Sequence, residues 1–261
     1  MIIQDPKTAH IVHTAFEAAA MFIGARYYFW LRRGQPVPPV LHGKGFMVML
    51  GCLAGAAIGN KLVFWLEVPH LWTPGGGFIQ FMYNGQSIVG GLLGGLIGVE
   101  LAKLLSGHRQ STGDLFVFPI LLGLSIGRVG CFLAGLNDGT YGVPTTLPWG
   151  VDFGDGIPRH PTQLYEIIFA LALWWGLKRL QPRLRSMPGA LFKLMLSAYL
   201  LWRLGVDGIK PVLYAYPLGL SGIQWICLLA LLCYLPFCLP AFRAAWSGSA
   251  QRAETKARTA T

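Results

Sequence analysis

The sequence predicts an all-α membrane protein built as a bundle of seven transmembrane helices. Two observations lead to this prediction. Of the 261 residues, 54% are hydrophobic and only 12% are charged, and the mean hydropathy is +0.51. Soluble domains contain about 25% charged residues, so this composition indicates a chain that lies in lipid. The second observation is a series of long apolar runs, each of a length that can cross a bilayer.

An α-helix needs about 20 mainly apolar residues to cross a hydrocarbon layer about 30 Å thick. We expect seven such helices, near residues 12–31, 45–66, 86–105, 114–136, 163–180, 187–206 and 218–240. No stretch indicates a second, soluble domain. We therefore expect a polytopic membrane domain over residues 1–241. A polar cytoplasmic tail follows over 242–261, and its lack of apolar periodicity predicts disorder.

The distribution of Lys and Arg sets the expected orientation, because cytoplasmic loops are enriched in these residues. Lys and Arg are concentrated after the first, third and fifth expected helices and in the tail. This pattern places the N-terminus outside and the C-terminus in the cytoplasm. The net charge of +10 then reflects orientation and attraction to anionic lipids, and we do not expect nucleic acid as a partner.

Glycines recur every four residues in the second and third expected helices. They are Gly51, Gly55 and Gly59, followed by Gly90, Gly94 and Gly98. Small residues at this spacing let two helix backbones approach closely, so we expect these two helices to pack tightly. A phosphate-binding loop is not indicated, because the Lys-Ser or Lys-Thr ending of that motif is absent.

Arg128 lies inside the apolar stretch "SIGRVGCFLAG". A charged side chain within a membrane is costly unless it is paired or hydrated, so Arg128 should face the interior of the bundle. Other polar residues fall near the same, outer ends of the expected helices: His13, Glu17, Asn60, Lys61, Asn84, Gln86, His160, Gln163, Tyr165, Glu166, Arg203, Asp207 and Lys210. Together they predict a polar, net cationic pocket that suits an anionic phosphate headgroup.

Four stretches of the sequence resemble the prolipoprotein diacylglyceryl transferase family. The two main ones are "GRVGCFLAG" (127–135) and "RHPTQLYE" (159–166), with "GGLIG" (94–98) upstream and "LGLSGIQW" (218–225) downstream. The resemblance implies a bundle of seven helices in a bacterial plasma (inner) membrane. It also implies transfer of a diacylglyceryl group from phosphatidylglycerol to the lipobox cysteine of a prolipoprotein, or a related transfer from an anionic phospholipid to another acceptor. Prolipoprotein signal peptides would be partners, and no cofactor is implied.

The resemblance also suggests roles for individual residues. Arg128 corresponds to the signature arginine and Arg203 to an arginine of the sixth helix, and both would stabilise the departing phosphate. Lys210 stands where the family usually has another arginine, while Leu93 stands where it has the histidine favoured as base. Catalytic roles are expected for Arg128, His160, Glu166, Arg203, His13 and Glu17. Substrate-binding roles are expected for Gly127, Gly130, Asp138, Gln163, Tyr165 and Lys210.

His13 and Glu17 are four residues apart and share one helix face, so a carboxylate could orient an imidazole that replaces the family base. The alternative is a structural contact between helices. With His10 the pair would form only half of a metal site, and we expect no bound metal. Cys131 could in principle be a nucleophile, although a buried cysteine is usually inert.

For Glu166, two readings stay open, a counter-ion for Arg128 or an acid-base group, and His160 could instead cap a helix. At the level of the whole protein, the alternative function is a non-catalytic lipid-binding or accessory membrane protein. A transporter is disfavoured, because a transport path needs polar groups on both sides of the membrane, and Glu100 is nearly alone on the inner side.

Overall fold

The computed structural model describes residues 2–33, 35, 40, 42–69 and 85–258. Seven α-helices make up most of this part of the chain: α1 Pro6–Arg32, α2 Gly43–Glu67, α4 Ile88–Ser106, α5 Val117–Ala134, α6 Thr162–Leu180, α7 Ala190–Val206 and α8 Gly222–Arg258. Each helix expected from the sequence coincides with one of them, so the all-α class is confirmed. Short 3-10 helices lie between them: η2 Asp114–Phe116, η3 Gly135–Asn137, η4 Gln181–Leu184, η5 Asp207–Ile209 and η6 Pro217–Gly219.

Four helical segments of the described chain are long and apolar enough to cross a membrane. These are Gly43–Glu67, Ile88–Ser106, Asp114–Asn137 and Gly222–Arg243. Large apolar side chains on the outside of the bundle are strongly exposed, as at Phe22, Leu104 and Leu105. Exposed apolar surface on this scale is characteristic of a face that contacts lipid.

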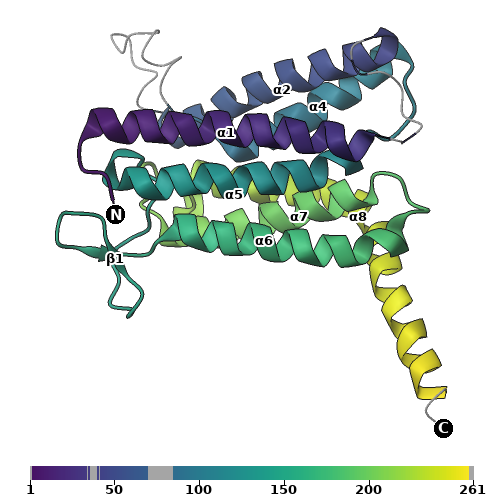
Figure 1. Ribbon diagram of the computed structural model, residues 1–261. Helices are drawn as coiled ribbons and strands as arrows, with labels where there is room; N and C mark the ends of the chain where they lie inside the picture. The colour runs from purple at the N-terminus through teal and green to yellow at the C-terminus, as the bar shows by residue number, and fades with distance from the viewer. Residues whose placement is uncertain (1, 34, 36–39, 41, 70–84, 259–261) are drawn as a thin grey trace.

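The helices lie side by side, with α1 next to α5 and α5 next to α6 (Figure 1). The most extensive helix contacts are those between α2 and α4, α1 and α5, α7 and α8, and α5 and α6. The N-terminal end of α1, the C-terminal end of α5 and the N-terminal end of α6 meet at one end of the bundle (Figure 1). This arrangement brings residues that are distant in sequence to one place.

The expected close packing of α2 and α4 is confirmed. A Cβ atom added at Gly55 would overlap the carbonyl oxygen of Gly94, and one added at Gly94 would overlap the carbonyl oxygen of Gly55. Gly51 and Gly98 face each other in the same way one turn away. The two backbones are therefore in direct contact, which only glycine permits at these positions.

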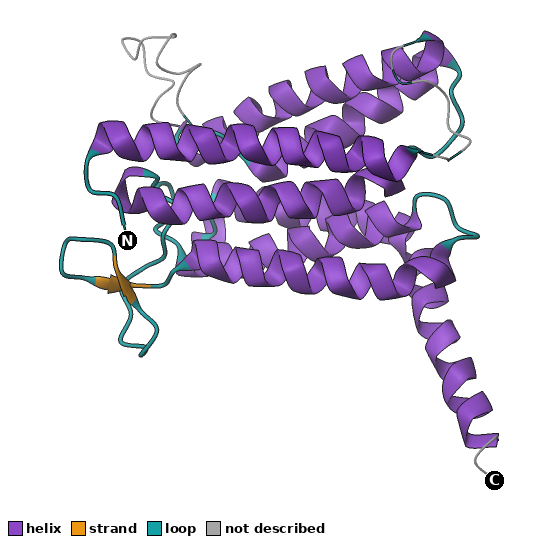
Figure 2. Cartoon of the chain, in the orientation of Figure 1, coloured by secondary structure: helices purple, strands orange, loops and turns teal. Residues whose placement is uncertain are grey.

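At the same end of the bundle, a short hairpin follows α5. It is formed by β1 Val151–Asp152 and β2 Pro158–Arg159, which pair antiparallel (Figure 2). Asp152 Oδ1 accepts hydrogen bonds from the backbone N–H groups of Gly154, Asp155 and Gly156. Arg159 donates to both carboxylate oxygens of Asp155, and these hydrogen bonds hold the pKa of Asp155 below its ordinary value.

The last helix is the longest of the seven described helices. Helix α8 continues to Arg258, and its last part leaves the bundle at an angle (Figure 1). Ala is the most frequent residue in this last part of the sequence, and it has the highest helix propensity. Extending an existing helix also needs no new nucleation. Two prolines inside α8, Pro236 and Pro240, are of the kind that bend a helix.

Candidate active site

Arg128 of α5 and Glu166 of α6 form a buried ion pair at the centre of the site. Arg128 Nε lies 2.8 Å from Glu166 Oε2, and the two residues are 6% and 1% exposed. Glu166 Oε1 accepts a hydrogen bond from the hydroxyl group of Tyr199 at 2.7 Å and lies 3.8 Å from Arg203 Nη1. Glu166 thus joins α5, α6 and α7. The sequence left two roles open for Glu166, and this geometry is that of a counter-ion for Arg128.

A second group of charges continues from Arg203 beyond the end of α7. Arg203 Nη2 donates to both carboxylate oxygens of Asp207 at 2.9 Å, and Lys210 Nζ lies 3.4 Å from Asp207 Oδ1. Burial, followed by the positive charge of Arg203, lowers the pKa of Lys210 to about 8.

We refer to five of these side chains as the cation cluster: Arg128, Glu166, Arg203, Asp207 and Lys210. Three of them are cationic and two are carboxylates, and the carboxylate of Glu67 interacts with Arg203 and Lys210 from the end of α2. Three cations gathered at one place suit an anionic phosphate group, since arginine and lysine both bind phosphate oxygens.

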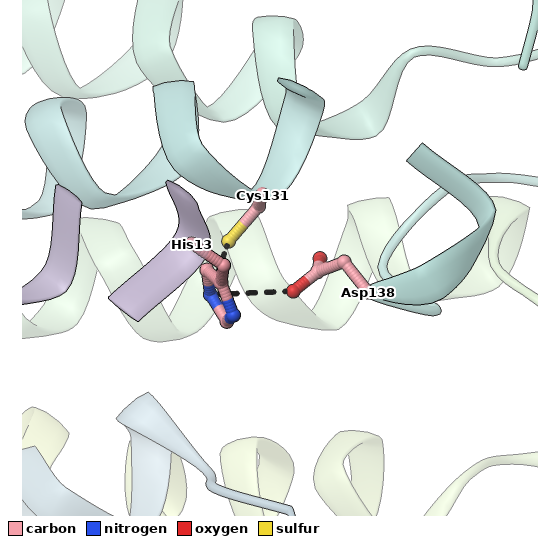
Figure 3. Close-up of side chains that lie close together, drawn as sticks. All are labelled: His13, Cys131 and Asp138. Atoms are coloured by element: carbon pink, nitrogen blue, oxygen red, sulfur yellow. Dashed lines mark hydrogen bonds and ion pairs between the residues drawn. The ribbon is translucent and has the colours of Figure 1, made fainter. Parts of the chain in front are cut away.

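His13 of α1 lies beside Cys131 of α5 and Asp138, which follows η3 (Figure 3). His13 Nε2 is 3.5 Å from Cys131 Sγ, 3.4 Å from Asp138 Oδ1 and 3.7 Å from Glu17 Oε1. Asp138 therefore approaches the imidazole more closely than Glu17, the partner expected from helix spacing. Asp138 in turn accepts a hydrogen bond from the hydroxyl group of Thr140.

The two groups of side chains are linked through Arg128, whose Nη1 donates to Cys131 Sγ at 3.7 Å. His13 and Cys131 are 118 residues apart in the sequence, and they meet because α1 packs along α5. We refer to His13, Cys131 and Asp138 as the thiol-imidazole group. It places a thiol, an imidazole and a carboxylate directly beside the buried arginine.

His160 and Tyr165 are not part of either group. His160 Nδ1 lies 3.2 Å from the hydroxyl oxygen of Tyr165, which also accepts a hydrogen bond from Trp149 Nε1 at 2.8 Å. The backbone of His160 pairs with Gly142 and Val143. These contacts tie His160 and Tyr165 to the loop that precedes β1. The N-cap of α6 is Pro161, so His160 does not cap this helix.

Gln163 lies between His160 and Tyr165 in the sequence and is 1% exposed. Neither its amide nitrogen nor its amide oxygen has a hydrogen-bond partner among the described residues. Buried amide groups are nearly always hydrogen-bonded, so Gln163 has donor and acceptor capacity left for a ligand.

The two glycines expected to bind substrate, Gly127 and Gly130, differ in how closely other atoms surround them. A Cβ atom at Gly130 would lie 2.6 Å from the Cβ of Phe16, whereas one at Gly127 would meet nothing within 4 Å. Gly130 is thus required for the packing of α5 against α1, and this contact, rather than a ligand, explains its missing side chain.

Several polar residues that the sequence groups with this pocket lie elsewhere. Asn60 accepts a hydrogen bond from the backbone of Ser87 at 2.6 Å, and Lys61 donates to the carbonyl group of Gly85 at 2.9 Å. Both hold the start of α4. Gln86 is exposed, and Asn84 lies outside the described residues.

The sequence did not single out Tyr199 or Thr140. Tyr199 lies one helical turn before Arg203 on the same face of α7, and this spacing is the signal that could have identified it. Thr140 could not have been identified, because its contact with Asp138 depends on how the chain turns after η3.

An open apolar groove runs along α6 and α7 next to Tyr165. Its volume is about 560 Å³, and it is lined by Tyr165, Phe169, Ala198, Leu201, Trp202, Gly205, Val206 and Ile209. The rings of Phe169 and Trp202 stack at 4.5 Å between centroids. An apolar groove that begins at a polar residue matches the two parts of a lipid, acyl chain and headgroup.

The fold and the site together define an integral membrane protein with a buried cationic centre suited to a phospholipid headgroup. The model of the prolipoprotein diacylglyceryl transferase family matches residues 8–239. The chain belongs to this family, which confirms the resemblance seen in the sequence.

Similar proteins carry the same name, phosphatidylglycerol–prolipoprotein diacylglyceryl transferase. One from Bordetella parapertussis is 33% identical over 206 residues, which cover 69% of this chain and 70% of the relative. One from Nitratidesulfovibrio vulgaris is 30% identical over 222 residues, or 78% of each chain. One from Trichormus variabilis is 29% identical over 239 residues, which cover 80% of this chain and 83% of the relative.

Proposed function

We propose that this protein transfers a diacylglyceryl group from phosphatidylglycerol to the cysteine thiol of a prolipoprotein and releases glycerol phosphate. Family membership and the names of the relatives support this function. The observation in the structure that carries it is the cation cluster, which gathers three cationic side chains at one end of an apolar bundle. Few other reasons exist to keep such charges inside a membrane protein.

The reaction explains what these charges would do. A thiolate sulfur attacks the glyceryl carbon, an S–C bond forms, and the C–O bond to phosphorus breaks with its electron pair going to oxygen. The phosphodiester carries one negative charge, and the departing phosphomonoester carries two. Cations close to the phosphate therefore interact more strongly with the leaving group than with the bound lipid, which is the condition for catalysis.

Arg128 and Lys210 are the cations that we assign to the phosphate. Glu166 and Asp207 hold the neighbouring guanidinium groups in place, at 2.8 Å from Arg128 and 2.9 Å from Arg203. The unpaired amide of Gln163 would bind a glycerol hydroxyl group.

Acyl chains would lie in the groove beside Tyr165. This placement keeps the tails in an apolar environment.

The acceptor thiol must lose its proton, because the thiolate is the nucleophile. Leu93, which stands where the family has its favoured base, packs against a hydrophobic core cluster that includes Val89 and Tyr199. Activation of the thiol in this protein is therefore assigned to the thiol-imidazole group around His13, which adjoins Arg128.

We further propose that all seven helices cross a bacterial inner membrane, with the N-terminus outside and the C-terminus in the cytoplasm. The alternation of basic segments along the chain supports this orientation. It would place the cation cluster and the hairpin near the outer face, where an exported precursor arrives. Labelling of single cysteines introduced in the hairpin and after α6 would test it.

The activity is tested with purified protein, phosphatidylglycerol labelled in the headgroup and a lipobox peptide. We expect lipidated peptide and labelled glycerol phosphate in equal amounts, and neither with Arg128→Ala. A matched control is Arg159→Ala, since Arg159 is also paired with a carboxylate but lies in the outer hairpin. Binding of the lipid without release of glycerol phosphate would contradict a transferase and support a lipid-binding accessory protein.

A further inference from the structure

The thiol-imidazole group has an unusual concentration of acceptor atoms around one nitrogen. His13 Nε2 faces Cys131 Sγ, Asp138 Oδ1 and Glu17 Oε1 at 3.4 to 3.7 Å. A neutral imidazole nitrogen carries at most one proton, so it can satisfy only one of these acceptors at a time. A cation between His13 Nε2, Cys131 Sγ and Asp138 Oδ1 would bind these three atoms at once.

Two of the separations between the three ligand atoms match those of a tetrahedral zinc site. Zinc lies about 2.0 to 2.3 Å from nitrogen, oxygen and sulfur ligands, so two ligands at the tetrahedral angle are about 3.3 to 3.7 Å apart. The distances from His13 Nε2 to Cys131 Sγ and to Asp138 Oδ1 are 3.5 and 3.4 Å. One ligand atom from each of the three residues lies within 4.8 Å of the others.

Imidazole, thiolate and carboxylate ligands together favour zinc. A thiolate selects against the hard cations magnesium and calcium, which prefer oxygen ligands. From the sequence, only His10, His13 and Glu17 could be considered, and they form half a site at most. The structure shows His10 exposed and supplies Cys131 and Asp138 as the missing ligands.

We propose that His13, Cys131 and Asp138 bind a zinc ion whose fourth position is open and receives the thiol of the acceptor peptide as a thiolate. The use of the fourth position rests on the proposed transferase function, whereas the metal site itself does not. Three protein ligands and one open position are the usual composition of catalytic zinc sites. A thiol that coordinates zinc is deprotonated, which meets the requirement for a thiolate.

The surroundings support both the ion and its ligands. A thiolate and a carboxylate neutralise the two charges of zinc, and the charge of Arg128 is balanced by Glu166 at 2.8 Å. Thr140 donates to Asp138, and Arg128 donates to Cys131. Hydrogen bonds of this kind from neighbouring residues orient the ligands of a metal.

The proton of the acceptor thiol passes to the carboxylate of Glu17. The side chain of Glu17 is 41% exposed, so the proton can continue to water. The zinc-bound sulfur then forms the S–C bond, the C–O bond breaks, and its electron pair leaves with the phosphate beside Arg128. The product is a neutral thioether, a weak ligand that dissociates, and no oxidant or reductant is required.

Binding is tested with Co²⁺ in place of zinc, because cobalt bound by a thiolate absorbs light through a charge-transfer band. We expect one Co²⁺ per protein and a band that disappears in Cys131→Ser and in His13→Ala. Cys233→Ser is the matched control, since Cys233 is an exposed cysteine of α8 and should leave the band unchanged. Added lipobox peptide should strengthen the band by supplying a second thiolate, and a peptide with serine in place of the lipobox cysteine should not. A metal-free protein that shows no band when Co²⁺ is added overturns the proposal.

The role of the metal is tested separately, by release of glycerol phosphate from chelator-treated protein. We expect activity to be lost and then restored by zinc. Full activity of the metal-free protein would overturn thiol activation by zinc and leave the proposed transferase function intact. If every sample failed to release glycerol phosphate while the cobalt band formed, the transferase function and the use of the fourth position would both be wrong, and the metal site would stand.

Discussion

Arg128 Nε lies 2.8 Å from Glu166 Oε2, and this ion pair joins α5 to α6 at the buried centre of the site. Glu166 also accepts a hydrogen bond from Tyr199 and lies 3.8 Å from Arg203. A single carboxylate therefore holds two arginines from two helices. Removal of the Glu166 carboxylate should lower the stability of the fold. Removal of the planar guanidinium group of Arg128 should mainly lower the rate of catalysis.

We predict that Glu166→Gln lowers the free energy of unfolding by about 3 to 5 kcal/mol, because it leaves two buried guanidinium groups without this counter-ion. The measurement is thermal unfolding of the purified protein in a constant detergent. Glu100→Gln is the matched control, since Glu100 pairs with Lys103 on the surface of α4 and an exposed pair contributes about 0 to 1 kcal/mol. Equal effects of the two substitutions would show that the Glu166 ion pair is not central to the fold.

We predict that Arg128→Lys reduces kcat about 100-fold to 1,000-fold while the protein stays folded. Lysine keeps the charge but loses the planar fork that binds two phosphate oxygens, and loss of one donor to a developing anion has an effect of this size. The check is the rate of glycerol phosphate release at saturating phosphatidylglycerol. A variant with normal kcat would mean that Arg128 serves only to pair with Glu166.

The pKa of Lys210 predicts how substrate binding depends on pH. Burial and the nearby guanidinium groups of Arg203 and Arg128 lower this pKa to about 8, while the carboxylates of Asp207 and Glu166 oppose that shift. The ammonium form is therefore present below about pH 8 and is lost as the pH rises through this value. Binding of the anionic lipid should weaken in the same interval.

The measurement for Lys210 is KM for phosphatidylglycerol as a function of pH. We expect KM to rise above about pH 8 in the unmodified protein and to stay level in Lys210→Arg, which remains cationic. The conservative variant thus separates loss of charge at position 210 from other effects of alkaline pH. A rise of equal size in both proteins would assign the dependence to another group.

Packing of α2 against α4 can be tested at two neighbouring glycines. Gly94→Ala places a methyl group against the carbonyl oxygen of Gly55, and we expect a loss of about 1 to 3 kcal/mol, the usual effect of overpacking. In Gly91→Ala, on the same helix, the added carbon lies 4.0 Å from its nearest neighbours. Its expected effect is a gain of about 0.5 to 1 kcal/mol from helix propensity. Thermal unfolding of both variants checks the prediction, and equal destabilisation would rule out direct backbone contact at Gly94.

The positions of the helices could be predicted because they follow from local properties. A run of apolar residues long enough for a bilayer is visible without any knowledge of its neighbours, and each expected helix coincides with an observed one. The glycine repeat likewise predicts close packing from spacing alone.

The sequence alone also determined that Arg128 must face the interior and that an anionic headgroup suits its surroundings, because burying an unpaired charge in lipid is prohibitive. Only the tertiary structure decided its partners. For Glu166 the sequence left two roles open, a counter-ion for Arg128 or an acid-base group, and it did not indicate Tyr199 as a partner. His13 contacts Asp138 and Cys131 in addition to the nearby Glu17. These contacts join residues up to 125 positions apart, His13 and Asp138, and such contacts depend on which helices pack together. Helix spacing describes neighbours on one helix, whereas the chemistry of this site arises between helices.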